Sequence, residues 1–432
     1  MAVRLRIRGL PGRARRRIAI STVESLPLNP SNTVSNVDIL IVGSGPSGTA
    51  TGITLAQRSP DLAKRTLCID KTYHPREKIC GGGLTGNMLQ QLANLGISLD
   101  NLPSVNIDKC AAVYRSIRHE VELDPPFKVV RRDALDALLA RKMVDEGVRL
   151  SEGESYVSHE PQEDGRILVT TSKARYAVKV LVAADGAGSK IARSLEPRRR
   201  VKVHLAQFDV PLPQGLDPST MVYDFSAVTE ELHGYLWLFP TPLYNEEGHQ
   251  LVNVGLMQVG STRLGGGMNK LLREGLSRYG IELGDARINF HPEWAFDPDY
   301  AFSAPNILTV GDAAGIDPLF GEGLHQCIEY GVMAAREIER AFKRDSFAFK
   351  GYRRRILWSA MGMEMRLLRI PAKRLYHPGN QLWTSFIFNG AYLAKMMAAQ
   401  GQGEVQLHRR IVPIAGRALW HILAGNKNLP QV

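Results

Sequence analysis

The chain has 432 residues, more than a single hydrophobic core usually serves, so we expect two lobes with added segments. Its 44% hydrophobic content is that of a globular protein, and its four scattered cysteines exclude a disulfide-rich scaffold and a cysteine metal site. The net charge of +11 lies at the ends, because residues 1–24 carry +6 and residues 346–432 carry +11, which leaves −6 for the middle.

The first 35 residues read as a basic tail. They contain no acidic residue before Glu24 and lack the continuous apolar core of a secretory signal, so we predict a disordered tail, with an Arg-rich targeting segment as the alternative. No apolar run in the chain approaches the ~20 residues of a membrane-spanning helix. With its isolated thiols, the protein is expected to be cytoplasmic, with peripheral membrane contact as an option.

Residues 37–70 carry the most specific signal in the chain. An apolar strand over 37–42 leads into Gly43-Ser-Gly45-Pro-Ser-Gly48, a helical segment follows over 49–57, and a second strand ends at Asp70. Glycines at this spacing permit the tight turn, the close approach of backbone N–H groups to a pyrophosphate, and close packing of helix on strand. The order of strand, turn, helix, strand and acid predicts dinucleotide binding.

A glycine-rich loop follows. It reads Lys78-Ile-Cys80-Gly81-Gly82-Gly83, and a helix is expected over 87–95. Three consecutive glycines suit a loop whose backbone lies flat against something planar. Cys80 is either a proton donor at this loop or a small buried hydrophobic residue.

Two further segments have polar residues next to predicted strands and helices. Arg132 precedes a helix with core-spaced leucines, and residues 153–184 read as short strands of an antiparallel meander that ends in Ala184-Asp185-Gly186. Further on, a strand over 306–310 leads into Gly311-Asp312 and the Gly321-Glu322-Gly323 turn, before a helix over 324–342. An aspartate at a strand end can bind a polyol, and a helix N-terminus can stabilise negative charge.

These motifs, in this order and spacing, resemble the class A flavoprotein monooxygenase superfamily, which has the p-hydroxybenzoate hydroxylase fold. Lys78 to Gly83, the segment Tyr235-Leu-Trp237-Leu-Phe239-Pro240, and Asn253-Val-Gly255 resemble its geranylgeranyl reductase branch. The resemblance covers about residues 37–342 and implies FAD as the cofactor. It implies an α/β fold: a Rossmann-like FAD-binding domain (36–195 and 301–345), a β-sheet substrate domain (196–300) and a basic helical C-terminal extension (346–432).

The resemblance also implies the roles of single residues. The three glycines of the first turn would bind the pyrophosphate, Asp70 the adenine ribose, Arg132 the phosphate side and Asp312 the ribityl chain, while Asp185 would help to close over the cofactor. The implied catalytic residues are Cys80, Trp237 and Tyr235, and no metal site is expected. The implied cofactor-binding residues are Gly43, Gly45, Ser47, Gly48, Asp70, Lys71, Lys78, Gly81, Gly82, Gly83, Arg132, Asp185, Asp312, Gly321 and Gly323.

Tyr235, Trp237 and Phe239 alternate at the period of a strand, so we expect them on one face, either as core or as the wall of a substrate cavity. Beyond residue 342, Arg alternates with Trp, Phe, Leu and Met in segments interrupted by Pro371 and Pro378. These segments could lie on an anionic membrane surface, bind an acidic protein, or pack on the core as a lid. Nucleic acid is not an expected partner.

Two reactions fit the pattern. In the first, reduced FAD passes hydride to a prenyl double bond, and Cys80 or a neighbouring donor supplies the proton. In the second, reduced FAD activates O₂ to hydroxylate an aromatic or indole group, including a tryptophan side chain on a protein partner. The substrate is therefore apolar or aromatic, and either small or protein-borne. No second nucleotide-binding glycine motif is present, so NAD(P)H would bind transiently, or another electron donor would reduce the flavin.

Overall fold

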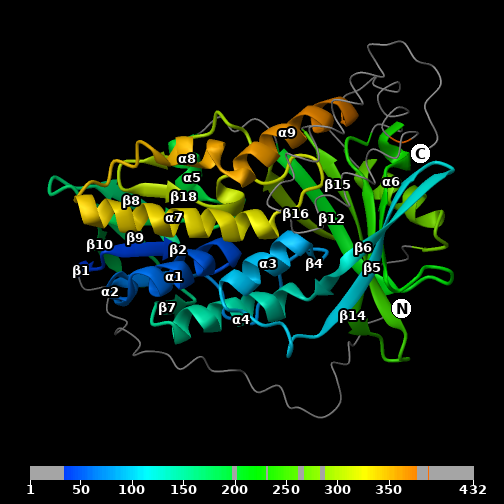
Figure 1. Ribbon diagram of the computed structural model, residues 1–432, viewed down its shortest axis with the longest axis horizontal. Helices are drawn as coiled ribbons and strands as arrows, with labels where there is room; N and C mark the ends of the chain where they lie inside the picture. The colour runs from blue at the N-terminus through cyan, green and yellow to red at the C-terminus, as the bar shows by residue number, and fades with distance from the viewer. Residues whose placement is uncertain are drawn as a thin grey trace.

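The computed structural model describes residues 34–196, 202–229, 232–260, 267–282, 288–376 and 388. Its strands form three sheets, and the longest helices lie against the central one (Figure 1). The basic tail up to residue 33 and most of the C-terminal extension lie outside the described residues.

The central sheet has six strands and holds the glycine motifs at one edge. In spatial order the strands are β17 (Ser303–Ala304), β18 (Ile307–Thr309), β11 (Val180–Ala183), β2 (Ile39–Val42), β3 (Thr66–Asp70) and β7 (Arg149–Glu152). All neighbours except β17 and β18 are parallel, and Ala183 pairs with both Val42 and Thr309. Since parallel strands end at the same edge, the loops after β2, β11 and β18 meet there.

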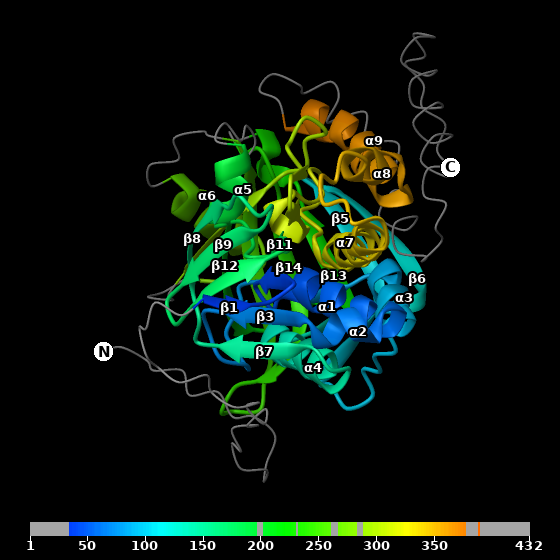
Figure 2. The ribbon, with the colours of Figure 1, turned by 90° about the vertical axis from the view of Figure 1, so that its left-hand side faces the viewer.

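Both faces of this sheet are covered, which explains why its inner strands β2 and β11 are apolar throughout. In β2, Ile39 and Ile41 belong to the core shared with helices, whereas Leu40 and Val42 pack against the small sheet on the opposite face. The helices on the first face are α1 (Pro46–Arg58), α3 (Gly86–Asn94), α4 (Arg132–Asp145) and α7 (Leu324–Arg344), with the short α2 (Pro60–Lys64) at the periphery. The short α5 (Lys190–Leu195) packs on the opposite face, where Ile191 joins the core of the small sheet. Figure 2 shows α7 lying between α1 and the C-terminal helices.

The small sheet contains β1 (Val34–Asn36), β10 (Arg175–Val178), β9 (Ile167–Thr171) and β8 (Tyr156–Pro161). It confirms the predicted meander with one exception. The strand expected as its last member, ending before Asp185, is β11, which leaves the meander and enters the parallel sheet between β2 and β18. The four buried residues of β11 require a neighbour on each side, which an edge of the meander would not provide.

The third sheet has eight strands and forms the second lobe. In spatial order they are β16 (Asn289–Trp294), β12 (Lys202–Pro211), β15 (Gln250–Val259), β14 (Leu236–Tyr244), β13 (Thr220–Asp224), β5 (Ser104–Tyr114), β6 (Ile117–Val130) and β4 (Gly83–Leu84). Three of them, β4 to β6, come from the part of the sequence assigned to the FAD-binding segment. Leu236 and Leu238 face the core under α6 (Gly267–Ser277), while Trp237 and Phe239 face the opposite core. The alternation predicted for this strand is therefore confirmed.

Two helices of the basic extension are described, α8 (Tyr352–Trp358) and α9 (Ala360–Leu375). They lie beyond α7, on the side away from α1 (Figures 1 and 2). The prediction that Pro371 interrupts this segment is wrong, because α9 continues through it to Leu375. Ala372 and Leu375 beyond the proline are buried against the large sheet's core, and this packing keeps the last turn in place.

The α/β fold, with a Rossmann-like domain, a β-sheet domain and C-terminal helices, is thus as predicted. Among the helices that the structure describes, none is both long and apolar enough to cross a membrane. The remaining short elements are the 3₁₀ turns η1 (Ser226–Thr229) and η2 (Gly311–Ala313).

Candidate functional site

The first glycine turn is built so that only its middle glycine faces open space. A Cβ on Gly43, whose φ is +106°, would lie 2.3 Å from the Ala184 carbonyl oxygen, and one on Gly48 would lie 1.9 Å from the Gly43 carbonyl oxygen. A Cβ on Gly45 would meet nothing nearer than Arg76 Nη2 at 3.5 Å. Gly43 and Gly48 therefore serve the turn and its packing, and Gly45 leaves the N-terminus of α1 open to an anion.

Asp70 organises this turn from the end of β3. Its carboxylate accepts hydrogen bonds from Ser44 N at 2.9 Å, Ser44 Oγ at 2.7 Å, Thr72 N at 2.9 Å and Thr72 Oγ1 at 2.7 Å. Burial raises the pKa of Asp70, but these hydrogen bonds outweigh burial and lower the pKa below 3.8. The ionised carboxylate thus holds the turn, and its contact with a ribose remains a prediction. The neighbouring Lys71 is exposed.

Two arginines share one buried carboxylate close to the turn. Asp136 on α4 accepts from Arg132 Nε at 2.9 Å and Arg132 Nη2 at 3.2 Å, and Arg76 Nη2 lies 3.1 Å from it. Arg132 also lies against the sulfur of Cys80. Arg76, beside Gly45, is the nearer cation for a phosphate, and it was not singled out by the sequence because it stands in a loop without a motif.

Buried oxygen atoms without partners lie at the same edge of the sheet. Among the described residues, Asp185 Oδ1 and Glu293 Oε2 have no hydrogen-bond partner. Burial raises the pKa of Asp185, and burial together with repulsion from Asp312 raises the pKa of Glu293 to about 8. The motifs after β11 and β18 meet here, because a Cβ on Gly186 would lie 4.0 Å from Asp312 Oδ2. Acceptors of this kind suit the hydroxyl groups of a ribityl chain, so the residues present fit FAD.

The same carboxylates raise the question of a metal. His291, Glu293 and Asp312 bring potential ligand atoms within 4.8 Å of one another. However, Lys78 Nζ lies 2.6 Å from His291 Nε2, and Lys78 and burial lower the pKa of His291 to about 4. A fixed cation at the ligand nitrogen opposes binding of a second cation, so the cluster favours a polyol or an anion.

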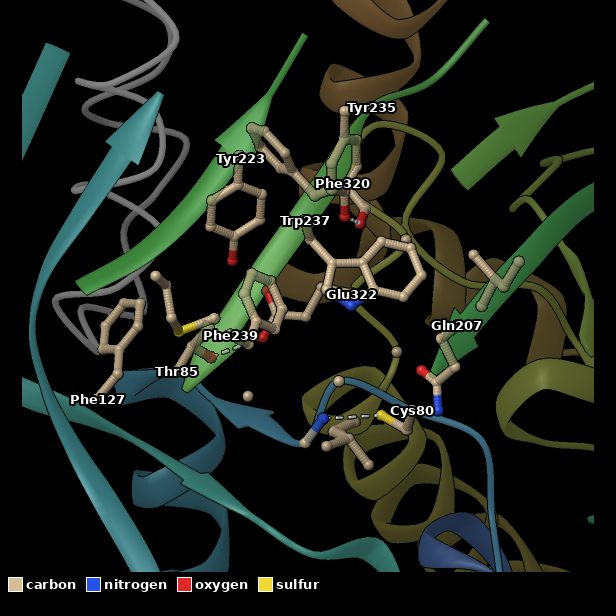
Figure 3. A pocket seen from close by; sticks show the side chains of 18 of the residues that line it. Cys80, Thr85, Phe127, Gln207, Tyr223, Tyr235, Trp237, Phe239, Phe320 and Glu322 are labelled. Atoms are coloured by element: carbon tan, nitrogen blue, oxygen red, sulfur yellow. Dashed lines mark hydrogen bonds between the residues drawn. The ribbon is translucent and has the colours of Figure 1, made fainter. Parts of the chain in front are cut away.

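A cavity joins this edge to the large sheet (Figure 3). The Cys80 loop forms one side, the loop before α7 another, and the aromatic face of β13 and β14 the wall. Its lining residues are Cys80, Gly81, Gly82, Gly83, Thr85, Cys110, Phe127, Leu205, Gln207, Met221, Tyr223, Tyr235, Trp237, Phe239, Glu293, Phe320, Gly321, Glu322, Gly323 and Leu324.

The glycines of the Cys80 loop are required by what they touch. A Cβ on Gly81 would lie 2.6 Å from Phe239 Cδ2, and one on Gly82, whose φ is +76°, would lie 2.0 Å from the Val130 carbonyl oxygen. The loop therefore packs closely against the ring of Phe239. The Gly82 N–H donates to Cys80 Sγ at 3.4 Å and fixes the cysteine at the mouth of the loop.

Two polar atoms of the aromatic wall, on Tyr235 and Trp237, are bonded inside the protein. The Tyr235 hydroxyl donates to the Phe320 carbonyl, and Trp237 Nε1 donates to Asn253 Oδ1 at 2.8 Å. Both side chains therefore present ring carbon atoms to the cavity, while Figure 3 shows the Tyr223 hydroxyl directed into it. Glu322 and Glu293 also line the cavity. Neither carboxylate was predicted as a site residue, because only the fold brings both of them to this space.

The structure thus brings most of the predicted site residues to one edge. The first turn, the Cys80 loop, Asp185, Asp312 and the turn before α7 surround the cavity and the space beside it. Ser47 lies on the packed side of α1, where a Cβ on Gly311 would be 2.6 Å from its hydroxyl oxygen. Lys71 points to solvent.

The sequence of this chain is similar to those of several known proteins. The family model described as FAD binding domain matches residues 36–231. Menaquinone reductase of Mycobacterium tuberculosis is 28% identical over 70% of this chain and 77% of its own length. Digeranylgeranylglycerophospholipid reductase 2 of Methanopyrus kandleri is 26% identical over 71% of this chain and 78% of its own length. A 1H-pyrrole-2-carbonyl-[peptidyl-carrier protein] brominase of Pseudoalteromonas luteoviolacea is 24% identical over 76% of this chain and 83% of its own length.

Solved structures share the fold. A geranylgeranyl bacteriochlorophyll reductase-like protein from Thermoplasma acidophilum superposes with a TM-score of 0.71 at 18% identity, over 91% of this chain and all of the other. Halogenase PltM in complex with FAD superposes with a TM-score of 0.64 at 16% identity, over 90% of this chain and 85% of the halogenase. The glycine turn, Asp185, Asp312 and the matched domain identify the protein as an FAD-dependent oxidoreductase, and its residues 36–231 carry an FAD binding domain of the class A flavoprotein monooxygenase type.

Proposed function

We propose that this oxidoreductase saturates a carbon–carbon double bond in the prenyl chain of a lipid or quinone. The observation that carries the proposal is the cavity wall, in which the hydroxyl of Tyr235 and the indole N–H of Trp237 are bonded inside the protein. Their ring faces offer apolar contact without a polar group that would need a partner on the substrate. A hydrocarbon chain fits such a wall.

The residues around the cavity have separable roles in this proposal. When bound, reduced FAD supplies the hydride. The Cys80 loop lies against Phe239 and holds its backbone toward the flavin side, and Trp237 and Phe239 contact the substrate chain. The second half of the addition requires a proton, and Cys80 and Glu322 both line the cavity as candidate donors.

The relatives support this choice. Two of them are named as reductases of menaquinone and of digeranylgeranylglycerophospholipids, and both names denote molecules with prenyl chains. NAD(P)H or another electron donor would reduce the flavin.

The alternative is an O₂-dependent reaction on an aromatic or indole group, including one carried by a protein. The brominase relative, whose name includes a carrier protein, favours it. The double-bond reduction needs no O₂, whereas the alternative reaction requires it, and this difference gives a direct test.

The test uses purified protein loaded with FAD, reduced with dithionite without oxygen, and mixed with geranylgeranyl lipid or menaquinone. Flavin absorbance and mass spectrometry of the lipid are followed together. The proposal expects flavin reoxidation with a gain of two hydrogen atoms in the lipid. Reoxidation only after oxygen is admitted, together with oxygen insertion into an aromatic substrate, would favour the alternative.

The outer face of α8 and α9 supports contact with a membrane that holds such a lipid. Trp358 and Ile370 are 69% and 62% exposed, and the guanidinium of Arg366 lies 5.7 Å from the centre of the Trp358 ring. Aromatic and basic side chains together suit the interface of an anionic bilayer. Sedimentation with vesicles that contain phosphatidylglycerol, compared between the wild type and Trp358→Ala, tests this contact. An acidic protein partner would instead leave both in the supernatant.

A further inference from the structure

A buried chain of ionisable groups runs from the cavity toward the C-terminal helices. Glu322 lines the cavity, and its Oε1 accepts from Thr85 Oγ1 at 2.6 Å. The same oxygen lies 3.0 Å from Nδ1 of His325, in the first turn of α7. On the other side of the imidazole, Nε2 lies 3.9 Å from Oε2 of Glu364 on α9.

The imidazole in the middle of this chain of groups is less exposed than the carboxylate at either end. His325 is 1% exposed, whereas Glu322 is 13% and Glu364 9% exposed. The imidazole therefore lies between two carboxylates that are each more accessible, one beside the cavity and one on the outer helix layer. Figure 3 shows Glu322 at the cavity below Trp237.

We propose that Glu322, His325 and Glu364 form a proton relay from α9 to the cavity, and that Glu322 delivers the proton used in double-bond reduction. This inference rests on the proposed function. Hydride adds to one carbon of the double bond, and the second carbon takes the proton from the Glu322 carboxyl as its O–H bond breaks. Glu322 then recovers a proton from Nδ1 of the imidazolium form of His325, which leaves a neutral ring that keeps its proton at Nε2. The ring turns so that the free Nδ1 faces Glu364, takes the proton of the Glu364 carboxyl and turns back, and the Glu364 carboxylate is recharged from water.

The charges around the imidazole suit this role. His325 faces Glu322 from the preceding loop and Glu364 from α9, and Glu329 of α7 and Asp317 belong to the same cluster. Burial lowers the pKa of His325, but the two carboxylates outweigh burial and hold the pKa well above its usual value. Burial raises the pKa of Asp317 to about 7 and also raises that of Glu329. The cluster therefore retains exchangeable protons near neutral pH.

Proton transfer along these groups requires rotations of the His325 and Glu364 side chains. Within the described part of the chain, neither ring nitrogen of His325 has a hydrogen bond of good angle, and Glu364 Oε1 has no hydrogen-bond partner. A turn of the Glu364 carboxylate, or one water molecule, would close the 3.9 Å gap. Catalytic hydrogen bonds are commonly loose before substrate binds.

The experiment compares Glu322→Gln, His325→Gln and Glu364→Gln with the control Glu337→Gln. Glu337 is a buried carboxylate of the same helix, paired with Arg340 and Arg355 away from the cavity. Flavin absorbance and thermal midpoints establish that each variant folds and holds FAD. The rate of flavin reoxidation by geranylgeranyl lipid without oxygen is then measured from about pH 6 to about pH 9.

We expect Glu322→Gln and His325→Gln to react about 10²-fold more slowly than the control, with unchanged reduction by dithionite. The rate of Glu364→Gln should fall at a lower pH than that of the wild type, because His325 loses a stabilising charge. Added imidazole should restore His325→Ala. As a readout that needs no turnover, NMR titration of ¹³C-labelled histidines should show the His325 pKa falling in Glu364→Gln.

The outcomes separate the two proposals. Failure of the wild type to reduce any prenyl substrate would overturn the proposed function and the relay with it. Reduction by the wild type that is equally fast in His325→Gln and Glu337→Gln at every pH would overturn the relay alone. If Cys80→Ser abolishes reduction while Glu322→Gln does not, the proton comes from Cys80 and the relay is also overturned.

Discussion

Trp237 Nε1 donates a hydrogen bond of 2.8 Å to Asn253 Oδ1, which joins the aromatic wall on β14 to its neighbour β15. Asn253 in turn donates from Nδ2 to Asp209 Oδ1 at 2.7 Å, and Asp209 pairs with Arg131 at 3.2 Å. The orientation of the indole is thus fixed by a chain of polar contacts that extends to β12 and to the residue before α4.

Asn253→Leu should therefore destabilise the protein, since it keeps the branching of the side chain but replaces both polar atoms by larger methyl groups. The indole N–H would be left buried without a partner, at a cost of about 1–3 kcal/mol in the free energy of unfolding. Urea unfolding of the wild type and the variant measures this. The exposed Asn94→Leu serves as the control, and equal losses in both variants would contradict the role assigned to Asn253.

Gly45→Ala should separate cofactor binding from folding. A methyl group there meets no atom closer than 3.5 Å, so the free energy of unfolding without FAD should stay within about 0.5 kcal/mol of the wild type. Affinity for FAD should fall tenfold or more, about 1.4 kcal/mol, if the pyrophosphate approaches the backbone at Gly45 as predicted, because the methyl would then stand in its way. Quenching of flavin fluorescence measures the affinity.

Gly43→Ala is the contrasting variant. Its φ of +106° and the 2.3 Å approach to Ala184 predict loss of folding as well as of FAD binding. Unchanged FAD affinity in Gly45→Ala would show that the cofactor does not lie against this turn.

Gly81→Ala and Gly83→Ala test the contact between the loop and the aromatic wall. The new methyl of Gly81→Ala would meet Phe239, whose ring is held by Tyr223 and Trp237 at centroid distances of 5.0 and 6.3 Å. That of Gly83→Ala would meet the flexible end of Met221 at 3.0 Å. We expect Gly81→Ala to lower stability by about 1–3 kcal/mol and to slow substrate reduction, and Gly83→Ala to do less of both. Thermal unfolding and anaerobic reoxidation measure these effects, and the reverse order would contradict the packing described.

Asp317 should make stability depend on pH. Burial, with repulsion from Glu322 and Glu364, raises its pKa from 3.8 to about 7, although the Leu319 N–H donates to it at 2.7 Å. The folded state therefore keeps a proton that the unfolded state loses above about pH 4. The contribution of the protonated Asp317 carboxyl to the free energy of unfolding is therefore full below about pH 4 and is lost as the pH rises toward 7.

In Asp317→Asn this loss should disappear. The stability difference between variant and wild type should grow in favour of the variant by up to about 3 kcal/mol between pH 5 and pH 8. Unfolding by urea at several pH values measures this. The exposed Asp100→Asn should give a curve parallel to that of the wild type, and a parallel curve for Asp317→Asn would show that Asp317 is ionised in the folded protein.

Local chemistry explains why much of the nucleotide-binding half could be predicted. The turn at Gly43 needs a residue that tolerates positive φ, the strand before it is apolar on both faces, and the helix after the turn follows at once. These requirements are met by residues close together in the chain, so they are visible in the sequence. The alternation of Tyr235, Trp237 and Phe239 likewise follows from the two-residue period of a strand.

Only the tertiary structure decided which distant residues line the cavity or lie next to the residues that line it. Glu293 comes from β16, Glu322 from the loop before α7, Glu364 from α9 and Arg76 from a loop without a motif, and no spacing in the sequence relates them. The strand before Asp185 pairs in the parallel sheet and not in the predicted meander, and α9 continues through Pro371. In each case burial against segments far away in the chain outweighed the local pattern, because the free energy of packing depends on neighbours that the sequence does not name.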